Sequence, residues 1–232
     1  MCSSDLRMTR PAPGGPCGGR RPAGPLPDGS RIRVVELLAT GTNGGAQESL
    51  VNTMTHLDVT RHDARVVSLS HGSTVARLQR LGTAVEVIDD LDDDRAAALL
   101  ADRLVAERTQ VLHAHMYRAE IVGAAAADLV QQRTGTRPLF VSTVHSSRFR
   151  SPADRERLER ITPTIDVLIA VSDAIVAKLV AEARDTTTIS RIYNGVDLVR
   201  FDGVGGGAAV RDGLGIPPGA PVALVEIGRA HV

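Results

Sequence analysis

Histidines that follow short apolar runs are the residues of this sequence best suited to bind a ligand. His113 and His115 are two residues apart at the end of one run, and His145 ends the next run along the chain. Side chains two apart on a strand point to the same side, so this pair could begin a zinc site with His145 as the third ligand. We favour two other roles: one histidine packs under the end of a sheet, and the other hydrogen-bonds a sugar or a phosphate. We therefore expect no bound metal.

A glycine-rich loop, Gly41-Thr42-Asn43-Gly44-Gly45-Ala46-Gln47, follows the first apolar run. Without Cβ atoms, the backbone at Gly44 and Gly45 could approach a ligand closely, and the free N–H groups at the start of the next helix favour an anion such as phosphate. A tight turn explains the same glycines, so both roles stay open. The spacing is not the G-x-G-x-x-G of dinucleotide-binding proteins, which argues against a nicotinamide enzyme.

Two other polar features have both a structural and a functional explanation. Tyr117, in a chain with 2 tyrosines, either packs at the start of a helix or offers its hydroxyl to a cleft. The acidic run between positions 89 and 94 could chelate a cation. Because the run precedes a helix, we expect it instead to cap the helix N-terminus and to interact favourably with the helix dipole.

Short β-branched runs alternate with amphipathic stretches from Arg31 onward, and these elements must position the polar residues. The runs that we predict to be strands are 32–38, 64–69, 84–88, 111–112, 139–144, 167–171 and 189–192. Apolar strands joined by helices predict an α/β fold, a doubly wound, Rossmann-like parallel sheet covered on both faces. Ligands of such sheets bind beyond the carboxyl ends of the strands, where the histidines, the glycine loop, Tyr117 and Asn194 would gather.

The composition argues against several functions. The 27 Lys plus Arg residues balance the 27 Asp plus Glu residues, and aromatic residues make up 2% of the chain. A neutral chain with few rings is a poor partner for nucleic acid. The cysteines, Cys2 and Cys17, lie in an irregular stretch and form no disulfide framework, so a cytoplasmic location is expected. No apolar run approaches the roughly 20 residues that span a bilayer.

The sequence predicts one folded domain between irregular stretches. Residues 1–30 are rich in Pro, Gly and Arg and are predicted to be a disordered leader, whose positive charge could touch an anionic membrane, although a solvated tail is the simpler explanation. We predict the domain over 31–201, a linker over 202–220, and the first strand of a second domain at 221–225. Residues 2–6 and 226–232 resemble translated sequencing adapters and are left out of the fold argument.

The order of these motifs resembles the N-terminal domain of retaining GT-B glycosyltransferases of the family 4 type. The similar segments are Arg33–Leu38 leading to Gly44–Gln47, Val111–His115, Ser142–His145, Ile169–Ser172, and Ile192–Asp197 with Phe201. Each motif is loose by itself, but together they follow the family's order from Arg31 to Phe201.

This resemblance implies transfer of a sugar from a nucleotide-sugar donor, such as a UDP- or GDP-sugar, to an acceptor with retention of configuration and without a metal or other cofactor. The donor would lie in a cleft between two Rossmann-like domains. Gly44 and Gly45 would approach the donor diphosphate or an acceptor phosphate, and His145 would contact the transferred sugar. His115 and Tyr117 would line the acceptor pocket, and Asn194 would belong to the same substrate-binding set.

The resemblance also implies that important parts of such a site lie outside this chain. In the family, the basic pair that holds the diphosphate and a Glu-x7-Glu motif belong to the second domain, and neither occurs here. We therefore expect a fragment of a longer enzyme that by itself has no appreciable transferase activity. The acceptor would be a sugar, a lipid or a small molecule, and the inner face of the membrane is one expected place of work. The alternative is a stand-alone Rossmann module that binds an acceptor or a partner chain without catalysis.

Overall fold

The computed structural model describes residues 30–146, 151–199 and 205–223. The predicted leader up to residue 29, both predicted adapter segments and Phe201 lie outside the described residues. Contacts divide the chain into two units, one that ends at Gly195 and one that begins at Val196. The first unit contains the sheet and the pocket described below.

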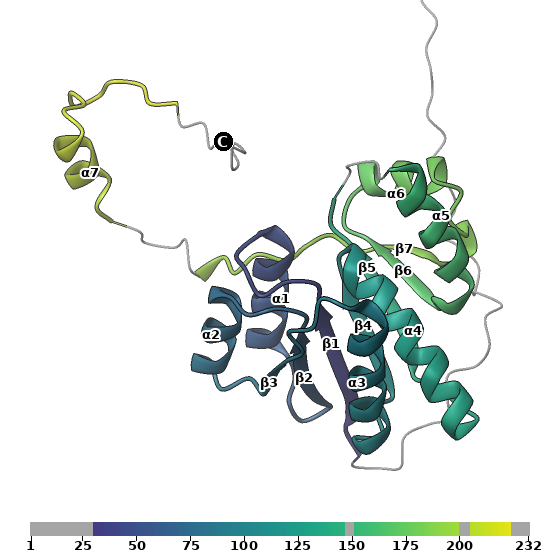
Figure 1. The fold of residues 1–232 in the computed structure, drawn as a ribbon. Helices are drawn as coiled ribbons and strands as arrows, with labels where there is room; N and C mark the ends of the chain where they lie inside the picture. The colour runs from purple at the N-terminus through teal and green to yellow at the C-terminus, as the bar shows by residue number, and fades with distance from the viewer. Residues whose placement is uncertain (1–29, 147–150, 200–204, 224–232) are drawn as a thin grey trace, which may run out of the picture. The chain divides into compact units, whose positions relative to one another are not determined.

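Seven parallel strands of the described chain form one sheet, in the order β3-β2-β1-β4-β5-β6-β7 (Figure 1). The strands are β1 Ile32–Leu38, β2 His62–Ser68, β3 Val85–Val87, β4 Val111–His115, β5 Leu139–Val144, β6 Val167–Ala170 and β7 Ile189–Arg191. Every predicted run contributes a strand, and the predicted doubly wound, Rossmann-like α/β fold is confirmed. The direction of winding reverses between β1 and β4, which is where ligands bind in sheets of this kind.

Strand β4 is longer than the predicted 111–112 because its histidines continue the ladder with β1. In the register of these two strands, Glu36 pairs with His113 and Leu38 pairs with His115. Leu112 is fully buried on the opposite face, as expected for alternating side chains. The two histidines therefore lie inside the end of the sheet rather than in the loop after it.

Helices connect the strands. The helices of the first unit are α1 Gly45–His56, α2 Ser73–Arg80, α3 Asp93–Ala106, α4 Tyr117–Thr134, α5 Pro152–Ile161 and α6 Asp173–Ala181, with short 3-10 helices at Thr162–Thr164 and Thr186–Thr188. The acidic run caps α3 as predicted, because Asp92 accepts hydrogen bonds from the backbone N–H groups of Asp94 and Arg95. None of the described helices is long and apolar enough to cross a membrane.

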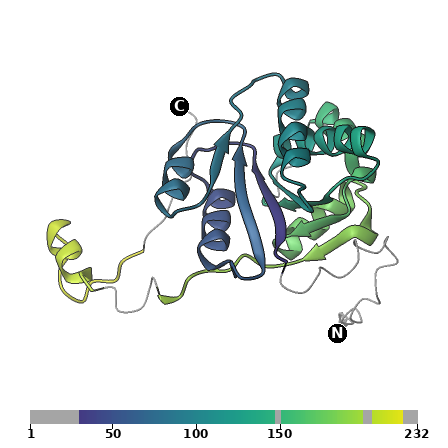
Figure 2. The ribbon, with the colours of Figure 1, turned by 90° about the horizontal axis from the view of Figure 1, so that it is seen from below.

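The helices cover opposite faces of the sheet, and Figures 1 and 2 show α1 and α2 on one side with α3 and α4 on the other. On the first side, Leu38 packs in one apolar cluster with Leu50 of α1 and Leu78 of α2. On the second side, Leu37 packs in the main cluster with residues of α3 and α4. Alternation along β1 thus places Glu36, like Leu38, on the side of α1.

The glycine-rich loop is held by backbone packing against the turn before α2. A Cβ atom on Gly72 would lie 2.2 Å from the carbonyl oxygen of Gly41, and one on Gly41 would lie 2.6 Å from the carbonyl oxygen of Ser70. The N–H of Thr74 also donates to the Gly41 carbonyl at 2.9 Å. Gly41 and Gly72 are therefore glycines because two backbones touch there.

The second unit contains one helix within its described residues, α7 Gly207–Gly213. It lies in the stretch predicted as a linker. Residues 221–223, the described part of the predicted strand 221–225, adopt no strand.

The contact between Gly41 and Gly72 predicts that Gly72→Ala destabilises the first unit. The methyl group would push against backbone atoms that cannot rotate away, so we expect the free energy of unfolding to fall by roughly 1–3 kcal/mol. Urea denaturation followed by circular dichroism measures this. Gly45→Ala is the matched control, because no atom lies within 4 Å of a Cβ at that position. Equal stability of the Gly72→Ala and wild-type proteins would contradict the packing described here.

Candidate functional site

A cavity of about 370 Å³ lies in the first unit at the carboxyl ends of β1, β4 and β5. Five of the predicted site residues line it, namely Gly44, Gly45, Tyr117, His145 and Asn194. They come from the glycine-rich loop, the start of α4, the residue after β5 and the segment after β7. Parallel strands bring these segments together because all their carboxyl ends meet at one edge.

His115 differs from the prediction that it lines the pocket. Its residue is 4% exposed, and it lies behind the pocket wall as the last residue of β4. The physical reason is the extra length of β4, which keeps this side chain in the sheet. Instead of a ligand, the ring nitrogens of His115 face Glu36 and His145.

The start of α1 forms one wall of the cavity. Gly44 is the N-cap residue and has extended backbone angles, and no side chain of the chain caps the helix there. A Cβ on Gly45 would meet nothing within 4 Å, whereas one on Gly44 would lie 2.6 Å from Oε1 of the buried Gln47 side chain. Packing of the chain therefore does not explain Gly45, whereas it does explain Gly41 and Gly72. Free N–H groups at this helix start are suited to an anion or another acceptor.

The turn from β4 into α4 forms a second wall and has unusual backbone geometry. Met116, which lines the cavity, has φ of 77°. A non-glycine residue in this region is strained by about 1–2 kcal/mol, and such strain is often found at binding sites. Tyr117 follows as the first residue of α4 and lines the cavity too. The sequence left open whether Tyr117 packs at a helix start or faces a cleft. In the structure it stands at the helix start and also lines the cavity.

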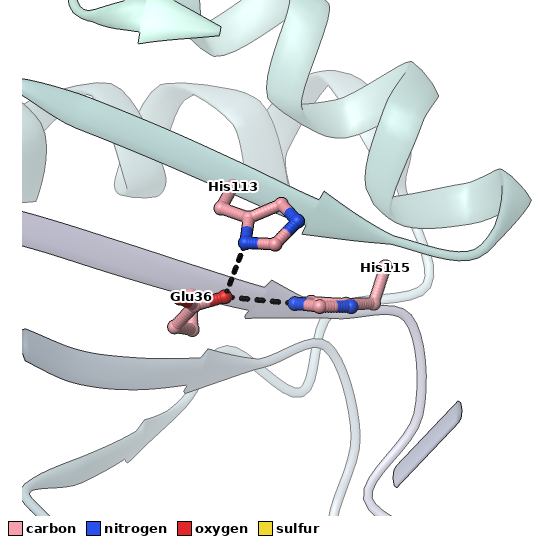
Figure 3. A group of neighbouring side chains, drawn as sticks. All are labelled: Glu36, His113 and His115. Atoms are coloured by element: carbon pink, nitrogen blue, oxygen red, sulfur yellow. Dashed lines mark hydrogen bonds and ion pairs between the residues drawn. The ribbon is translucent and has the colours of Figure 1, made fainter. Parts of the chain in front are cut away.

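Behind this wall, a carboxylate and two histidines form a compact cluster (Figure 3). Glu36 Oε2 lies 2.9 Å from His113 Nδ1 and 2.7 Å from His115 Nε2. The other nitrogen of His115 lies 3.3 Å from His145 Nε2, and the other nitrogen of His113 lies 2.7 Å from Thr143 Oγ1. The cluster thus joins the ends of β1, β4 and β5.

Glu36 was missed by sequence reasoning, although it carried a signal. It is the one charged residue within the run Val34-Val35-Glu36-Leu37-Leu38, and it is 6% exposed. A charge in the middle of a buried strand needs a partner of opposite charge or a set of hydrogen bonds. The register that supplies His113 as this partner cannot be read from the sequence.

The charge state of the cluster follows from its geometry. Burial alone would raise the pKa of the Glu36 carboxyl, but the charge and hydrogen bonds of His113 and His115 hold it well below its usual range. Burial tends to lower the pKa of His113, and Glu36 more than reverses this, so the pKa is raised. Burial, together with the charge of His113, lowers the pKa of His115. These shifts favour a carboxylate at Glu36 and neutral imidazole at His115, and they make His113 the easier of the two cluster histidines to protonate.

His145 is neutral as well. Burial, followed by the charges of His115 and His113, lowers the pKa of its imidazole to about 4. Its Nδ1 atom is buried and has no hydrogen-bond partner in the described part of the chain.

Glu36, His113 and His115 are the three residues of the described chain that could hold a metal ion, since their ligand atoms lie within 4.8 Å of one another. The third member is Glu36 rather than His145, which the sequence suggested. Tetrahedral zinc with bonds of about 2.0–2.1 Å would separate its ligand atoms by roughly 3.3 Å. The separations of 2.7 and 2.9 Å are those of hydrogen bonds. In this arrangement Glu36 is joined to the two histidines by direct hydrogen bonds.

Two buried ion pairs form the remaining polar wall. Arg184 lies 3.0 Å from Glu120, and Lys178 lies 2.9 Å from Glu182. Lys178 and Arg184 are the only Lys and Arg residues among those described as lining the cavity. Each already faces a carboxylate, so this wall is polar but its charges are balanced.

Comparison with known families now identifies the chain. A model of Glycosyltransferase Family 4 matches residues 43–200, a segment that begins in the glycine-rich loop and includes His145 and Asn194. The chain belongs to this family. No curated protein matches it.

Solved structures share the fold of this family 4 chain at low sequence identity. The Anabaena protein HepE in complex with UDP has 19% identity and a TM-score of 0.65 over 79% of this chain and 50% of that chain. A glycosyltransferase from Rickettsia africae has 14% identity and a TM-score of 0.66 over 82% and 51%. A UDP-N-acetylglucosamine 2-epimerase from Rickettsia bellii has 14% identity and a TM-score of 0.55 over 82% and 52%. The chain therefore has a Rossmann-like fold shared with GT-B glycosyltransferases, and it spans about half the length of these structures.

The lowered pKa of His145 predicts a change in acid stability. In the unfolded chain this imidazole takes up a proton near pH 6.5, but in the folded chain it stays neutral until about pH 4. Since the unfolded state binds more protons between these values, stability is full above pH 6.5 and is lost as the pH falls through this window. His145→Gln should reduce that slope, by up to about 1.4 kcal/mol per pH unit.

Urea denaturation of both proteins at several pH values between 4 and 7 measures this difference. His56→Gln is the control, because it removes an exposed histidine without touching the site. Parallel stability curves for wild type and His145→Gln would show that His145 is not held neutral in the folded chain.

Proposed function

We propose that this chain provides the acceptor-side half of a retaining glycosyltransferase that uses a nucleotide sugar as donor. The observation that carries the proposal is the family match over residues 43–200, which spans the cavity at the reversal point of the sheet. HepE, with the same fold, is described in complex with UDP and with UDP-glucose. A uridine or related nucleotide sugar is therefore the donor class that we propose for the complete site.

The start of α1 is the place at which we propose that a phosphate group or another oxygen-rich part of the substrate binds. Gly45 leaves open space at the start of the helix, where backbone N–H groups have no partner within the helix, and Asn194 and Tyr117 line the same cavity. His145, which directly follows β5, is proposed to contact the transferred sugar from another wall of the cavity. Hydroxyl groups of a sugar match such a wall of neutral donors and acceptors.

The described cavity has no unpaired cation for a leaving diphosphate. Lys178 and Arg184 are each paired with a carboxylate. Stabilising the charge that develops on a leaving diphosphate requires positive groups aimed at it. We therefore propose that these groups belong to a separate donor-binding half, and that this chain by itself binds substrate parts without turning them over.

Incubation of the purified chain with UDP-glucose, other nucleotide sugars and a panel of sugar acceptors tests this proposal. We expect nucleotide release no faster than in buffer, because the described residues that line the cavity offer no unpaired cation to lower the barrier. The same assay on the Rickettsia africae glycosyltransferase shows that the conditions support transfer. Turnover of this chain at a comparable rate would overturn the division of labour proposed here.

The open space at Gly45 gives a prediction about binding. Gly45→Ala should fold at least as well as wild type, because alanine favours the helix, but its methyl group would intrude where substrate approaches. We expect the Kd for the best-binding probe among UDP-glucose, UDP and inorganic phosphate to rise about tenfold, or about 1.4 kcal/mol. Isothermal titration calorimetry measures the Kd.

Gly207→Ala is a matched control for this variant. Gly207 is also the first residue of a helix, and a Cβ there would also meet nothing within 4 Å. Both variants remove a glycine from a helix start, but only Gly45 lines the cavity. If both variants bound the probe as wild type does, the start of α1 would not be the binding wall.

We also propose that substrate binding needs no resident metal ion. The carboxylate and the two histidines that could hold one are already joined by hydrogen bonds at 2.7 and 2.9 Å. The titrations above should therefore give the same Kd with and without EDTA. A Kd that rises in EDTA and is restored by zinc would show instead that the cluster opens to hold an ion.

A further inference from the structure

A chain of hydrogen-bonding groups runs from the middle of the sheet to the wall of the cavity. It begins at Glu36 on β1, continues 2.7 Å away at His115 on β4, and ends 3.3 Å further at His145 after β5. Glu36 and His115 are 6% and 4% exposed, whereas His145 lines the cavity. The chain of contacts therefore connects two groups that no ligand can reach with one that a ligand can reach.

The direction of each hydrogen bond is fixed by the carboxylate. An ionised carboxyl can only accept, so the nitrogen of His115 that faces Glu36 must carry the hydrogen. Neutral His115 has a single N–H group, and Nδ1 on its other side is then an acceptor. His145 Nε2 faces this acceptor and must be the donor. In neutral His145 this leaves Nδ1 with a lone pair and without a hydrogen.

His113 disfavours a second proton on His115, because burial and the charge of His113 together lower the pKa of His115. It donates from Nδ1 to the same oxygen of Glu36, and its Nε2 lies 2.7 Å from Thr143 Oγ1. The ring centres of His113 and His115 are 4.2 Å apart. The histidine with the more exposed side chain, His113 at 19% against 5% for His115, is thus the one on which a positive charge is favoured. Two imidazolium rings at this distance would repel each other.

We propose that Glu36 and His115 are positioning residues that hold His145 as its Nε2–H tautomer, so that His145 accepts a hydrogen bond from a ligand hydroxyl through Nδ1. The Nδ1 atom is buried and lacks a partner among the described residues, which leaves it available for such a donor. The identity of the ligand rests on the proposed function, in which a sugar supplies the hydroxyl. A sugar with fluorine in place of that hydroxyl offers no hydrogen and would lose the contact.

Nuclear magnetic resonance of chain labelled with ¹⁵N-histidine tests the proposal directly, because the two neutral tautomers have different nitrogen shifts. The signal of His145 is assigned by its loss in His145→Gln. At pH 7 we expect wild-type His145 as a single Nε2–H tautomer. In Glu36→Gln and in His115→Phe the constraint is removed, and we expect signals of a mixture of both tautomers. A wild-type Nδ1–H tautomer, or an unchanged single tautomer in both variants, would overturn the proposal.

Asp166→Asn is the control for general loosening of the fold. Asp166 binds Arg137 with two hydrogen bonds of 2.6 and 2.9 Å before β6 begins, at the opposite end of the strands from the cavity. Its loss should lower the melting temperature but leave the tautomer of His145 unchanged. A mixture of tautomers in this control would mean that any weakening of the sheet frees His145, which would overturn a specific role for Glu36. Because His115→Phe removes the middle link while Glu36 keeps its pairing with His113, the test remains decisive if Glu36→Gln does not fold.

Addition of UDP-glucose to the labelled wild-type chain separates this proposal from the proposed function. A shift of the His145 signal with the Nε2–H tautomer in place supports both. The predicted tautomer without any shift, for UDP-glucose and for other nucleotide sugars, supports the positioning role and counts against the proposed function. A shift with the wrong tautomer supports the function and overturns the positioning role.

Discussion

A carboxylate in the middle strand of a parallel sheet has to be neutralised where it lies, because neither face of the sheet offers it enough water. Burying an isolated carboxylate costs several kcal/mol of free energy even after the protein relaxes. Ion pairing and hydrogen bonds must recover about this amount. Glu36 meets this constraint with two histidines from the next strand, which the register places beside it. Because the two histidines share one carboxylate, the pKa of His113 is raised while that of His115 is lowered.

The same constraint organises the edge of the sheet at which the cavity lies. Strand β5 is tied to β4 through the contacts of Thr143 with His113 and of His145 with His115. These contacts fix side chains of three strand ends relative to one another. Across the cavity, the glycine-rich loop is fixed differently, by backbone contacts of Gly41 with the turn before α2. Side-chain hydrogen bonds and backbone packing thus stabilise opposite walls.

Much of the fold could be predicted from the sequence, because buried parallel strands require apolar β-branched runs and the runs are separated by helical spacing. The cap of α3 at Asp92 was also predictable, because capping depends only on residues close together in the sequence. Glu36 and the buried position of His115 were not, because both depend on where β4 ends and on which residue of β1 it faces. The roles of the glycines were also beyond local reasoning. Gly72 is required by the backbone of Gly41, which is remote in sequence, whereas no neighbour requires a glycine at position 45.

Charge balance among the described residues limits the chemistry that this cavity can perform. The cations Lys178 and Arg184 are each paired with a carboxylate, so the charges of these two cavity-lining residues are balanced by close partners. What remains are partial charges: the N–H groups at the start of α1 and the lone pair of His145. Partial charges of this kind are suited to hydrogen bonds with hydroxyl groups or a single phosphate, but they are too weak to offset the negative charge that would develop on a departing nucleoside diphosphate. The arrangement therefore favours orientation of a substrate over the step that breaks its bond.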